Sequence, residues 1–274
     1  MQHTLMHISD LHAGSPFNPR VADQLAREAH DLHPDLLVIS GDLVQRADFP
    51  AQWATITEYL RILPEPRLII PGNHDVPLFN PLARLFRPLD VYRRYITPDL
   101  NPVFERPGLA VVGGNSAHGL TVDGGYVSRA QRETMERAFA RWPDGVCKVA
   151  VLHHGVVRPP GCERRSIIRN ADDVIRMLDR SGVELLLCGH HHVAYVGTTR
   201  DVRPDLQHGT IIVQSGTSTS RRVRHGEHGR NSYNVITIED GVIRIRQHLY
   251  REDTRRYVAS AEHVFPQRSA HVAT

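Results

Sequence analysis

The chain has 274 residues, 41% of them hydrophobic, so it is long enough and apolar enough to bury the core of one large folded domain. Its formal net charge of +3 comes from basic residues spread along the chain, which does not predict a nucleic-acid partner. The three cysteines form no CxxC pair, which excludes a disulfide framework and favours a reduced, cytoplasmic protein.

The first part of the chain alternates strand and helix signals. Apolar runs at 5–8, 36–39 and 67–70 are typical of buried strands, while the apolar periods at 21–32 and 53–63 predict helices. This alternation predicts an α/β fold in which parallel strands are joined by helical crossovers. A strand is predicted almost at the N-terminus, so we expect no signal peptide, and no run approaches the length of a membrane span.

Residues 77–107 interrupt the alternation. Six prolines separate short helical pieces that carry aromatic and aliphatic side chains. We interpret this segment as a small helical cap inserted beside a functional site. The alternative is a structural excursion that packs on the edge of the domain.

The remaining chain first resumes the alternation and then becomes strand-rich. Further strands are predicted at 109–112, 146–152, 184–188, 210–213, 233–238 and 242–250, with helices at 128–142 and 170–180. The pair Asp240-Gly241 predicts a tight turn between the last two strands. We therefore expect a single domain over residues 1–251 that includes the cap, followed by a polar, loosely ordered C-terminal tail at 252–274.

Polar clusters directly follow almost every one of these apolar runs. They are Asp10 with His12, Gly41-Asp42, Gly72-Asn73-His74-Asp75, His153-His154 and Gly189-His190-His191-His192. The chain thus carries carboxylates and imidazoles to strand ends, as in a metal site. A ligand set of this kind, without thiolates, suits Mn, Fe, Zn or Co.

The spacing within the clusters predicts which side chains converge. Residues i and i+2 of an extended backbone point to the same side, so Asp10 should converge with His12. By the same argument His190 should converge with His192, while His191 points away. Only one of two adjacent histidines can face the site, and we expect His154 and His191 to lie behind the ligands or at the rim.

Two metal ions held close together can bind a phosphoryl group and activate water, so the composition of the clusters predicts phosphoester hydrolysis. The order DxH, GDxx, GNHD, H and GHxH over residues 10–192 resembles the calcineurin-like metallophosphoesterase superfamily. The resemblance implies a four-layer α/β/β/α sandwich and a site for two divalent or trivalent transition-metal ions.

The resemblance also implies roles for individual residues. Asp10, His12 and His192 would bind one metal, Asn73, His153 and His190 the other, and Asp42 would bridge them. His74 is similar to the residue that contacts the phosphate and assists the leaving group, and Asp75 to the residue that orients it. A hydroxide held between the metals would attack phosphorus without a phosphoenzyme.

Within the superfamily, the compact chain, the N-terminal DLH and the GNHDVP segment resemble bacterial class III cyclic-nucleotide phosphodiesterases and glycerophosphodiesterases. We therefore expect a phosphodiesterase acting on cyclic nucleotides or small phosphodiesters, with loose specificity that includes monoesters. Expected substrate contacts, besides the cap, are Asn115, His118, His191 and Arg164. The loop that carries Arg164 could instead be a solvated face.

Three alternatives stay open. A nuclease of the same superfamily should show a basic stripe interleaved with aromatic residues, and a nucleotide-lipid pyrophosphatase should have a longer, more apolar cap. A non-catalytic scaffold should have lost ligands, yet all seven are present. The sequence departs from many relatives at Gly155, where proline is common, and at His191, where a small residue is frequent.

Overall fold

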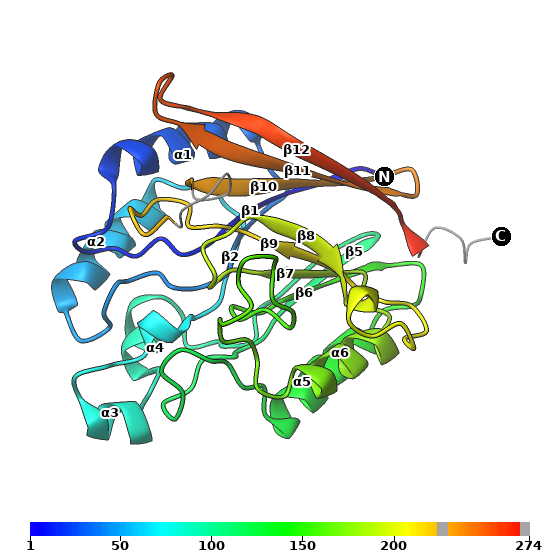
Figure 1. Cartoon of the computed structure of the whole chain (residues 1–274), viewed down its shortest axis with the longest axis horizontal. Coiled ribbons are helices and arrows are strands. Elements are labelled where there is room, and N and C mark those ends of the chain that lie inside the picture. Colours follow the sequence, from blue (N-terminus) through cyan, green and yellow to red (C-terminus); the bar gives the residue numbers. More distant parts are fainter. Residues whose placement is uncertain (224–229, 269–274) are drawn as a thin grey trace.

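The computed structural model describes residues 1–223 and 230–268 and contains two six-stranded sheets (Figure 1). The first sheet has the order β12-β11-β10-β1-β2-β3, formed by β1 His3–Ile8, β2 Leu36–Ile39, β3 Arg67–Ile69, β10 Ser232–Glu239, β11 Val242–Arg251 and β12 Arg256–Pro266. The second has the order β4-β5-β6-β7-β9-β8, formed by β4 Val103–Arg106, β5 Leu109–Gly113, β6 Cys147–Val151, β7 Leu185–Cys188, β8 Tyr195–Thr198 and β9 Ile211–Gln214. The α-helices of the described residues are α1 Pro19–Leu32, α2 Pro50–Arg61, α3 Pro81–Phe86, α4 Asp90–Tyr95, α5 Arg129–Phe139 and α6 Ala171–Arg180.

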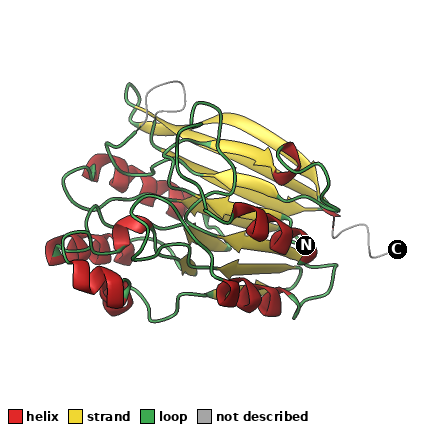
Figure 2. Ribbon diagram, turned by 60° about the horizontal axis from the view of Figure 1, so that its bottom comes forward, coloured by secondary structure: helices red, strands yellow, loops and turns green. Residues whose placement is uncertain are grey.

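The continuous apolar runs are explained by sheets that are covered on both faces (Figure 2). In β2, Leu36 and Val38 join the core between the two sheets, while Leu37 and Ile39 join the core beneath α1 and α2. Successive side chains of a strand point to opposite faces, so every residue of such a strand is apolar. The strand β7 divides its side chains in the same way between the central core and the core beneath α5 and α6. The predicted four-layer α/β/β/α fold is confirmed.

Residues 77–107 contain the two short helices α3 and α4, in agreement with a small helical insertion. Helix α4 is anchored, because Tyr92 is fully buried and donates a hydrogen bond to the carbonyl oxygen of Ile69 at 3.1 Å. Tyr95 stacks on Trp53 of α2 at a ring distance of 5.6 Å. The end of the predicted cap is wrong, since β4 lies within it and pairs with β5.

The C-terminal segment differs from the expectation of a loosely ordered tail at 252–274. Strand β12 pairs antiparallel with β11 over its whole length, so the expectation is wrong for Arg256–Pro266. Most of the strand is exposed, and a cross-strand charge cluster replaces apolar burial: Glu262 accepts hydrogen bonds from Arg244 at 2.5 Å and Arg246 at 2.6 Å. The last six residues of the tail, 269–274, lie outside the described residues.

The parallel strands of both sheets bring their carboxyl ends to one edge of the molecule. The strands β1, β2 and β3 are parallel neighbours in one sheet, and β5, β6 and β7 are parallel neighbours in the other. Loops at the carboxyl ends of parallel strands are where sites form in open α/β sheets. Among the described residues, no helix has the length and apolar character needed to cross a membrane.

Candidate metal centre

The predicted ligands converge, although not through extended backbone. Asp10, His12, Asp42, His190 and His192 all have left-handed backbone, with φ between 50° and 73°. This conformation is uncommon outside glycine and costs of order 1 kcal/mol or more per residue, and such residues concentrate at functional sites. Strand alternation therefore does not explain why these side chains converge: each of the five lies in a sharp turn just after its strand.

One group of side chains joins the ends of β1, β2 and β7. The carboxylate oxygen Oδ1 of Asp10 lies 3.1 Å from Nε2 of His192 and 3.7 Å from Nε2 of His12. The two imidazole nitrogens lie 3.0 Å apart, and Oδ2 of Asp42 is 3.7 Å from His12. All four residues are buried, so the group is closed to bulk water.

A second group joins the ends of β2, β3, β6 and β7. The amide oxygen of Asn73 lies 3.1 Å from Nε2 of His153 and 3.1 Å from Nδ1 of His190. Oδ1 of Asp42 lies 3.3 Å from the same nitrogen of His153 and accepts the backbone N–H of His74 at 2.8 Å. Asp42 thus turns one oxygen toward each group, the geometry of a shared carboxylate.

Glycines allow the turns to approach each other this closely. Gly41 has φ of 96°, and a Cβ there would lie 2.7 Å from the backbone nitrogen of Gly72 and 2.8 Å from Nδ1 of His153. A Cβ on Gly189 would overlap the side chains of Ser9 and Asp10. The glycine that precedes Asp42 and the one that precedes His190 are therefore steric requirements of the site.

The arrangement of donors and acceptors fits bound cations. Nδ1 of His192 donates to the carbonyl oxygen of Arg222 at 2.8 Å, and Nδ1 of His153 donates to that of Ser40 at 2.7 Å. In a neutral imidazole the other nitrogen then carries a lone pair. Both lone pairs face oxygen or nitrogen acceptors, and Oδ1 of Asp10 has no hydrogen-bond partner among the described residues. Two atoms that bind one metal ion at roughly 2.1 Å and at right angles to each other lie about 3 Å apart, which is the spacing of these acceptors.

The charge states agree with this interpretation. Burial lowers the pKa of His12 to about 3 and holds the pKa of His190 well below its usual value, so both rings are neutral. Burial alone would raise the pKa values of Asp10 and Asp42, but the facing histidines keep both well below the usual range. At His153 burial lowers the pKa, but the carboxylates of Asp42 and Asp10 and the carbonyl oxygen of Ser40 together raise it to about 9, so this position favours a positive charge. Neutral imidazoles and charged carboxylates are the forms that bind metals.

The two residues predicted to act on the leaving group have different surroundings. Asp75 is fully buried and accepts the backbone N–H groups of Leu43 at 2.9 Å, Val44 at 3.1 Å and Gly72 at 2.8 Å. Burial and the charge of Asp42 raise its pKa to about 7. The hydrogen bonds of the structure do not connect Asp75 to the ring of His74, so any effect on that ring passes through the loop backbone.

Two arginines that the sequence analysis missed flank His74. Nδ1 of His74 lies 2.7 Å from the carbonyl oxygen of Gln45 and 2.7 Å from Nη1 of Arg46. When Nδ1 donates to the carbonyl oxygen, Nε2 accepts from Nη1 of Arg222 at 2.9 Å. Nη1 of Arg46 donates to the same carbonyl at 2.7 Å. Burial lowers the pKa of His74, and the two guanidinium groups act in the same direction. With Asn73, these residues line a cavity of about 190 Å³.

Sequence position offers a signal for only one of the two arginines. Arg46 follows Asp42 within the same loop, so it could have been placed near the site. Arg222 lies thirty residues after His192, beyond every recognised cluster, and no pattern indicated it. Among the described residues, neither arginine forms an ion pair with a carboxylate, which leaves their charges available to a bound anion.

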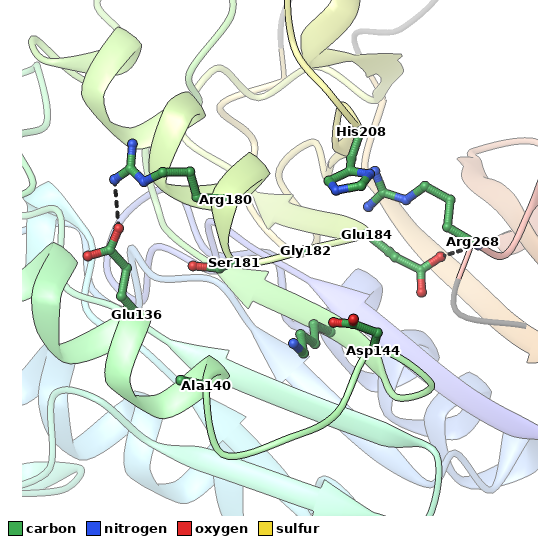
Figure 3. A pocket seen from close by; sticks show the side chains of 10 residues that line it. Glu136, Ala140, Asp144, Arg180, Ser181, Gly182, Glu184, His208 and Arg268 are labelled. Carbon is green, nitrogen blue, oxygen red and sulfur yellow. Dashed lines mark hydrogen bonds and ion pairs between the residues drawn. The ribbon is translucent and has the colours of Figure 1, made fainter. Parts of the chain in front are cut away.

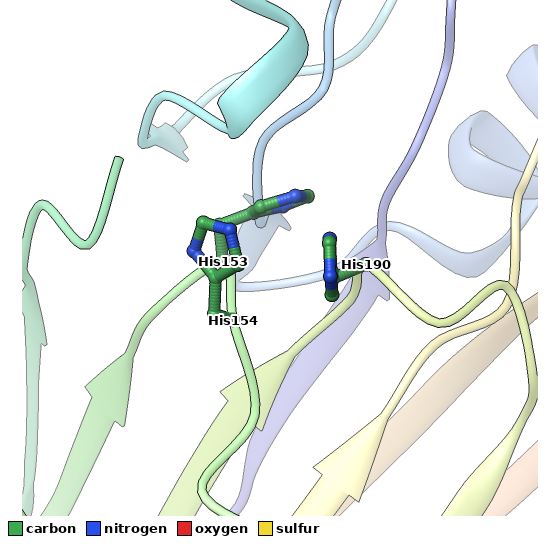
Figure 4. Close-up of side chains that lie close together, drawn as sticks. All are labelled: His153, His154 and His190. Atoms are coloured by element: carbon green, nitrogen blue, oxygen red, sulfur yellow. The ribbon is translucent and has the colours of Figure 1, made fainter. Parts of the chain in front are cut away.

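The two remaining histidines of the clusters behave differently from each other. The ring of His154 lies 4.8 Å from that of His153 and 4.5 Å from that of His190, so the expectation that it points away is wrong (Figure 4). Its Nδ1 contacts the hydroxyl of Ser116 at 2.8 Å, and its Nε2 has no hydrogen-bond partner among the described residues. His191 does point away, with ring nitrogens 3.1 Å from Gln214 and 2.9 Å from the carbonyl oxygen of Ser166.

The other expected substrate contacts are not gathered at the metal centre. The amide of Asn115 is engaged in a local turn with the backbone of Ala117. His118 contacts the carbonyl oxygen of Tyr126 at 2.6 Å and lines a separate pocket beneath the cap. Arg164 is exposed on its loop. Their roles in substrate binding stay predictions.

A charged pocket of about 570 Å³ lies at the amino ends of β6 and β7, at the opposite end of these strands from the ligands (Figure 3). Some of its charged side chains have partners within the pocket. Arg180 pairs with Glu136 at 2.7 Å, and Glu184 accepts the backbone N–H of Arg268 at 2.7 Å. We interpret this pocket as part of the structural framework.

Comparisons with known proteins agree with the fold. A family model described as calcineurin-like phosphoesterase matches residues 3–194, whereas no curated protein matches the sequence. Among solved structures, a purple acid phosphatase from yellow lupin (Lupinus luteus) seeds has a TM-score of 0.73 at 13% identity, and the match covers 100% of this chain but only 55% of that one. A dimetal phosphatase from Danio rerio has a TM-score of 0.66 at 11% identity, with coverage of 97% and 99%. Identities this low show a shared fold.

Proposed function

The chain belongs to the calcineurin-like phosphoesterase family, and on that premise we propose that it hydrolyses phosphodiester bonds of small molecules with the help of two bound metal ions. The observation that carries the proposal is Asp42, whose two oxygens face two separate groups of imidazole nitrogens and carboxyl or amide oxygens. Cyclic nucleotides and small phosphodiesters are the proposed substrates, with phosphomonoesters as slower ones.

The proposed ligands are those implied by the sequence. They are Asp10, His12 and His192 for one ion, Asn73, His153 and His190 for the other, and Asp42 shared between the two. Bound transition-metal ions such as Mn, Fe, Zn or Co would polarise the phosphoryl oxygens and supply an activated water at neutral pH.

The residues beside this centre bind and orient the phosphoryl group. Arg46 and Arg222 offer guanidinium donors from two sides of His74, where they offset negative charge that develops on the phosphoryl oxygens. His74 keeps its Nδ1 proton on Gln45, so a proton delivered to the leaving oxygen has to be carried on Nε2. The buried carboxylate of Asp75 holds the three loop amides that fix the backbone around these groups.

The surroundings of His74 favour a diester over a small monoester. The cavity over Asn73 and His74 is lined by arginines and Asp123, and also by the apolar side chains of Leu78 and Val122. A diester places one charged phosphoryl group next to a second organic substituent. The apolar border gives that substituent a surface to contact, which a small phosphomonoester would leave unused.

A substrate panel tests the proposal. The full chain, reconstituted with Mn(II), is assayed with bis(p-nitrophenyl) phosphate, p-nitrophenyl phosphate, cyclic AMP, DNA and a UDP-lipid, and its metal content is measured in parallel. We expect metal-dependent turnover that is faster for the diester than for the monoester. Turnover confined to DNA or to the UDP-lipid would favour a nuclease or a pyrophosphatase. Fewer than one bound metal and no turnover would favour a non-catalytic scaffold.

A further inference from the structure

Helix α3 of the cap presents apolar side chains to solvent. None of its residues is buried, and Leu82, Leu85 and Phe86 are 72%, 53% and 73% exposed. Leu82 and Phe86 lie one turn apart and therefore share a face of the helix. The helix stands at the margin of the molecule, away from both sheets (Figure 1). Packing of the protein core does not account for these side chains.

A neighbouring loop extends the exposed surface. We define the apolar lip as the side chains of Phe79, Leu82, Leu85, Phe86, Leu120 and Val122, each more than half exposed. Arg84 of α3 donates to the carbonyl oxygens of Pro77 and Thr121, which ties the helix to this loop. Leu85 and Leu120 also line one pocket of about 620 Å³. The lip is therefore a single surface on two connected segments, and exposed apolar patches of this kind mark interaction sites.

The lip is bordered by more arginines than carboxylates, the exposed carboxylates being Asp90 and Asp123. Arg87, Arg93 and Arg94 are exposed on and beside α3 and α4. Arg93 lies 3.5 Å from Asp90, whereas Arg87 and Arg94 form no ion pair with a described residue. Segments that lie in the headgroup region of a membrane combine phenylalanine and leucine with neighbouring arginines, as this surface does. Anionic lipids attract such arginines, and each arginine near the surface increases the affinity for the membrane about fivefold.

A second copy of the chain would meet this surface less well. A two-fold contact places the same patch against itself, so a patch with an excess of arginines would face a second patch with the same excess. An anionic membrane surface accepts both the apolar side chains and the arginines. We propose that the apolar lip docks on membrane surfaces that contain anionic phospholipids.

The orientation of the lip links docking to the candidate site. Val122 belongs to the lip, and its backbone carbonyl oxygen accepts a hydrogen bond from the side-chain amide of Asn73 at 3.2 Å. Val122 and Arg84 also line the cavity over His74. A docked molecule would thus hold the mouth of this cavity near the lipid headgroups. The inference concerns binding alone and does not depend on the proposed hydrolysis.

Vesicle sedimentation tests the proposal with the full chain. The probes are vesicles of phosphatidylcholine alone and of phosphatidylcholine mixed with phosphatidylglycerol in equal parts. We expect sedimentation with the mixed vesicles only, and release by high salt. Leu82→Ser with Phe86→Ser should weaken the partition coefficient by about tenfold or more, because two large side chains no longer enter the interface. Arg87→Gln with Arg94→Gln should weaken it about fivefold per arginine.

A matched control replaces two exposed valines outside the lip, Val202 at 51% and Val264 at 54% exposure, by serine. This control should bind like the unmodified chain, and circular dichroism should show all variants folded. Asp42→Ala should retain vesicle binding, which separates the lip from the metal centre. Absence of binding to mixed vesicles, equal binding by the Leu82/Phe86 variant or loss of binding in Asp42→Ala would overturn the proposal. So would an oligomer, seen by light scattering, that the Leu82/Phe86 variant dissociates, because the lip would then belong to a second copy.

Discussion

Gly41→Ala is the substitution whose effect follows most directly from the structure. The new Cβ would lie 2.8 Å from Nδ1 of His153, and ordinary contact begins near 3.4 Å, so the ring or the loop must move by about 0.6 Å. Alanine is also strained at the φ of 96° found here. Strain of about 1–2 kcal/mol and overpacking of about 1–3 kcal/mol give an expected loss of roughly 2–5 kcal/mol in the free energy of unfolding.

The expected loss corresponds to a melting temperature lower by roughly 4–20 °C for a chain of this size. A shift of this size at His153 should also lower turnover by about tenfold to a hundredfold, since displacements near 1 Å cost about that much. Differential scanning calorimetry and diester turnover measure the two effects. The control is Gly145→Ala, because a Cβ there meets no atom within 4 Å. Equal melting temperatures and equal turnover for the two variants would refute the reasoning.

Three further predictions concern other parts of the molecule. His74→Ala should lower turnover by roughly 10²–10⁴-fold while metal content, measured by elemental analysis, stays unchanged, and unchanged turnover would contradict a catalytic role. Arg222→Gln should raise KM for a diester more than it lowers kcat, because a guanidinium that binds the phosphoryl group is removed; an unaffected KM would exclude this contact. The carboxylate of Asp179 accepts three backbone N–H groups from residues 207–209, which lower its pKa against the effect of burial. Its stabilising effect is therefore present above the unfolded pKa of about 3.9 and is lost as the pH falls through the lower folded value. Asp179→Asn should lower the melting temperature at pH 7, and the difference in melting temperature between this variant and the unmodified chain should become smaller at acid pH. A difference in melting temperature that does not change with pH would contradict this assignment.

The layers of the fold and the convergence of the ligands could be predicted because both follow from local pattern. An apolar run such as 36–39 can only be a strand covered on two faces, and a polar cluster after each run has to reach the edge where parallel strands end. The turn at Asp240-Gly241 was predicted and is confirmed, since both residues have positive φ. In these cases the sequence signal and the physical cause lie within a few residues of each other.

The features that escaped prediction depend on contacts between distant segments. Strand β12 is polar and mostly exposed, so its pairing with β11 leaves no apolar period in the sequence. Arg222 reaches His74 only because the loop after β9 folds across the site. His154 was expected to turn away on the assumption of extended backbone, whereas the chain has already left β6 at this point. Asn170 begins α6 as predicted, yet its side chain bonds Val127 instead of capping the helix.

The two groups of ligands draw on both sheets, and this has a consequence for how the molecule holds together. Asp10 and Asn73 extend from the first sheet, and His190 and His192 extend from the second. A metal ion bound in either group would therefore cross-link the layers at the edge where parallel strands end and no hydrogen-bonded ladder joins them. Binding that favours only the folded chain adds to its stability in proportion to the logarithm of free metal concentration. The supply of metal would then affect the stability of the folded protein as well as its chemistry.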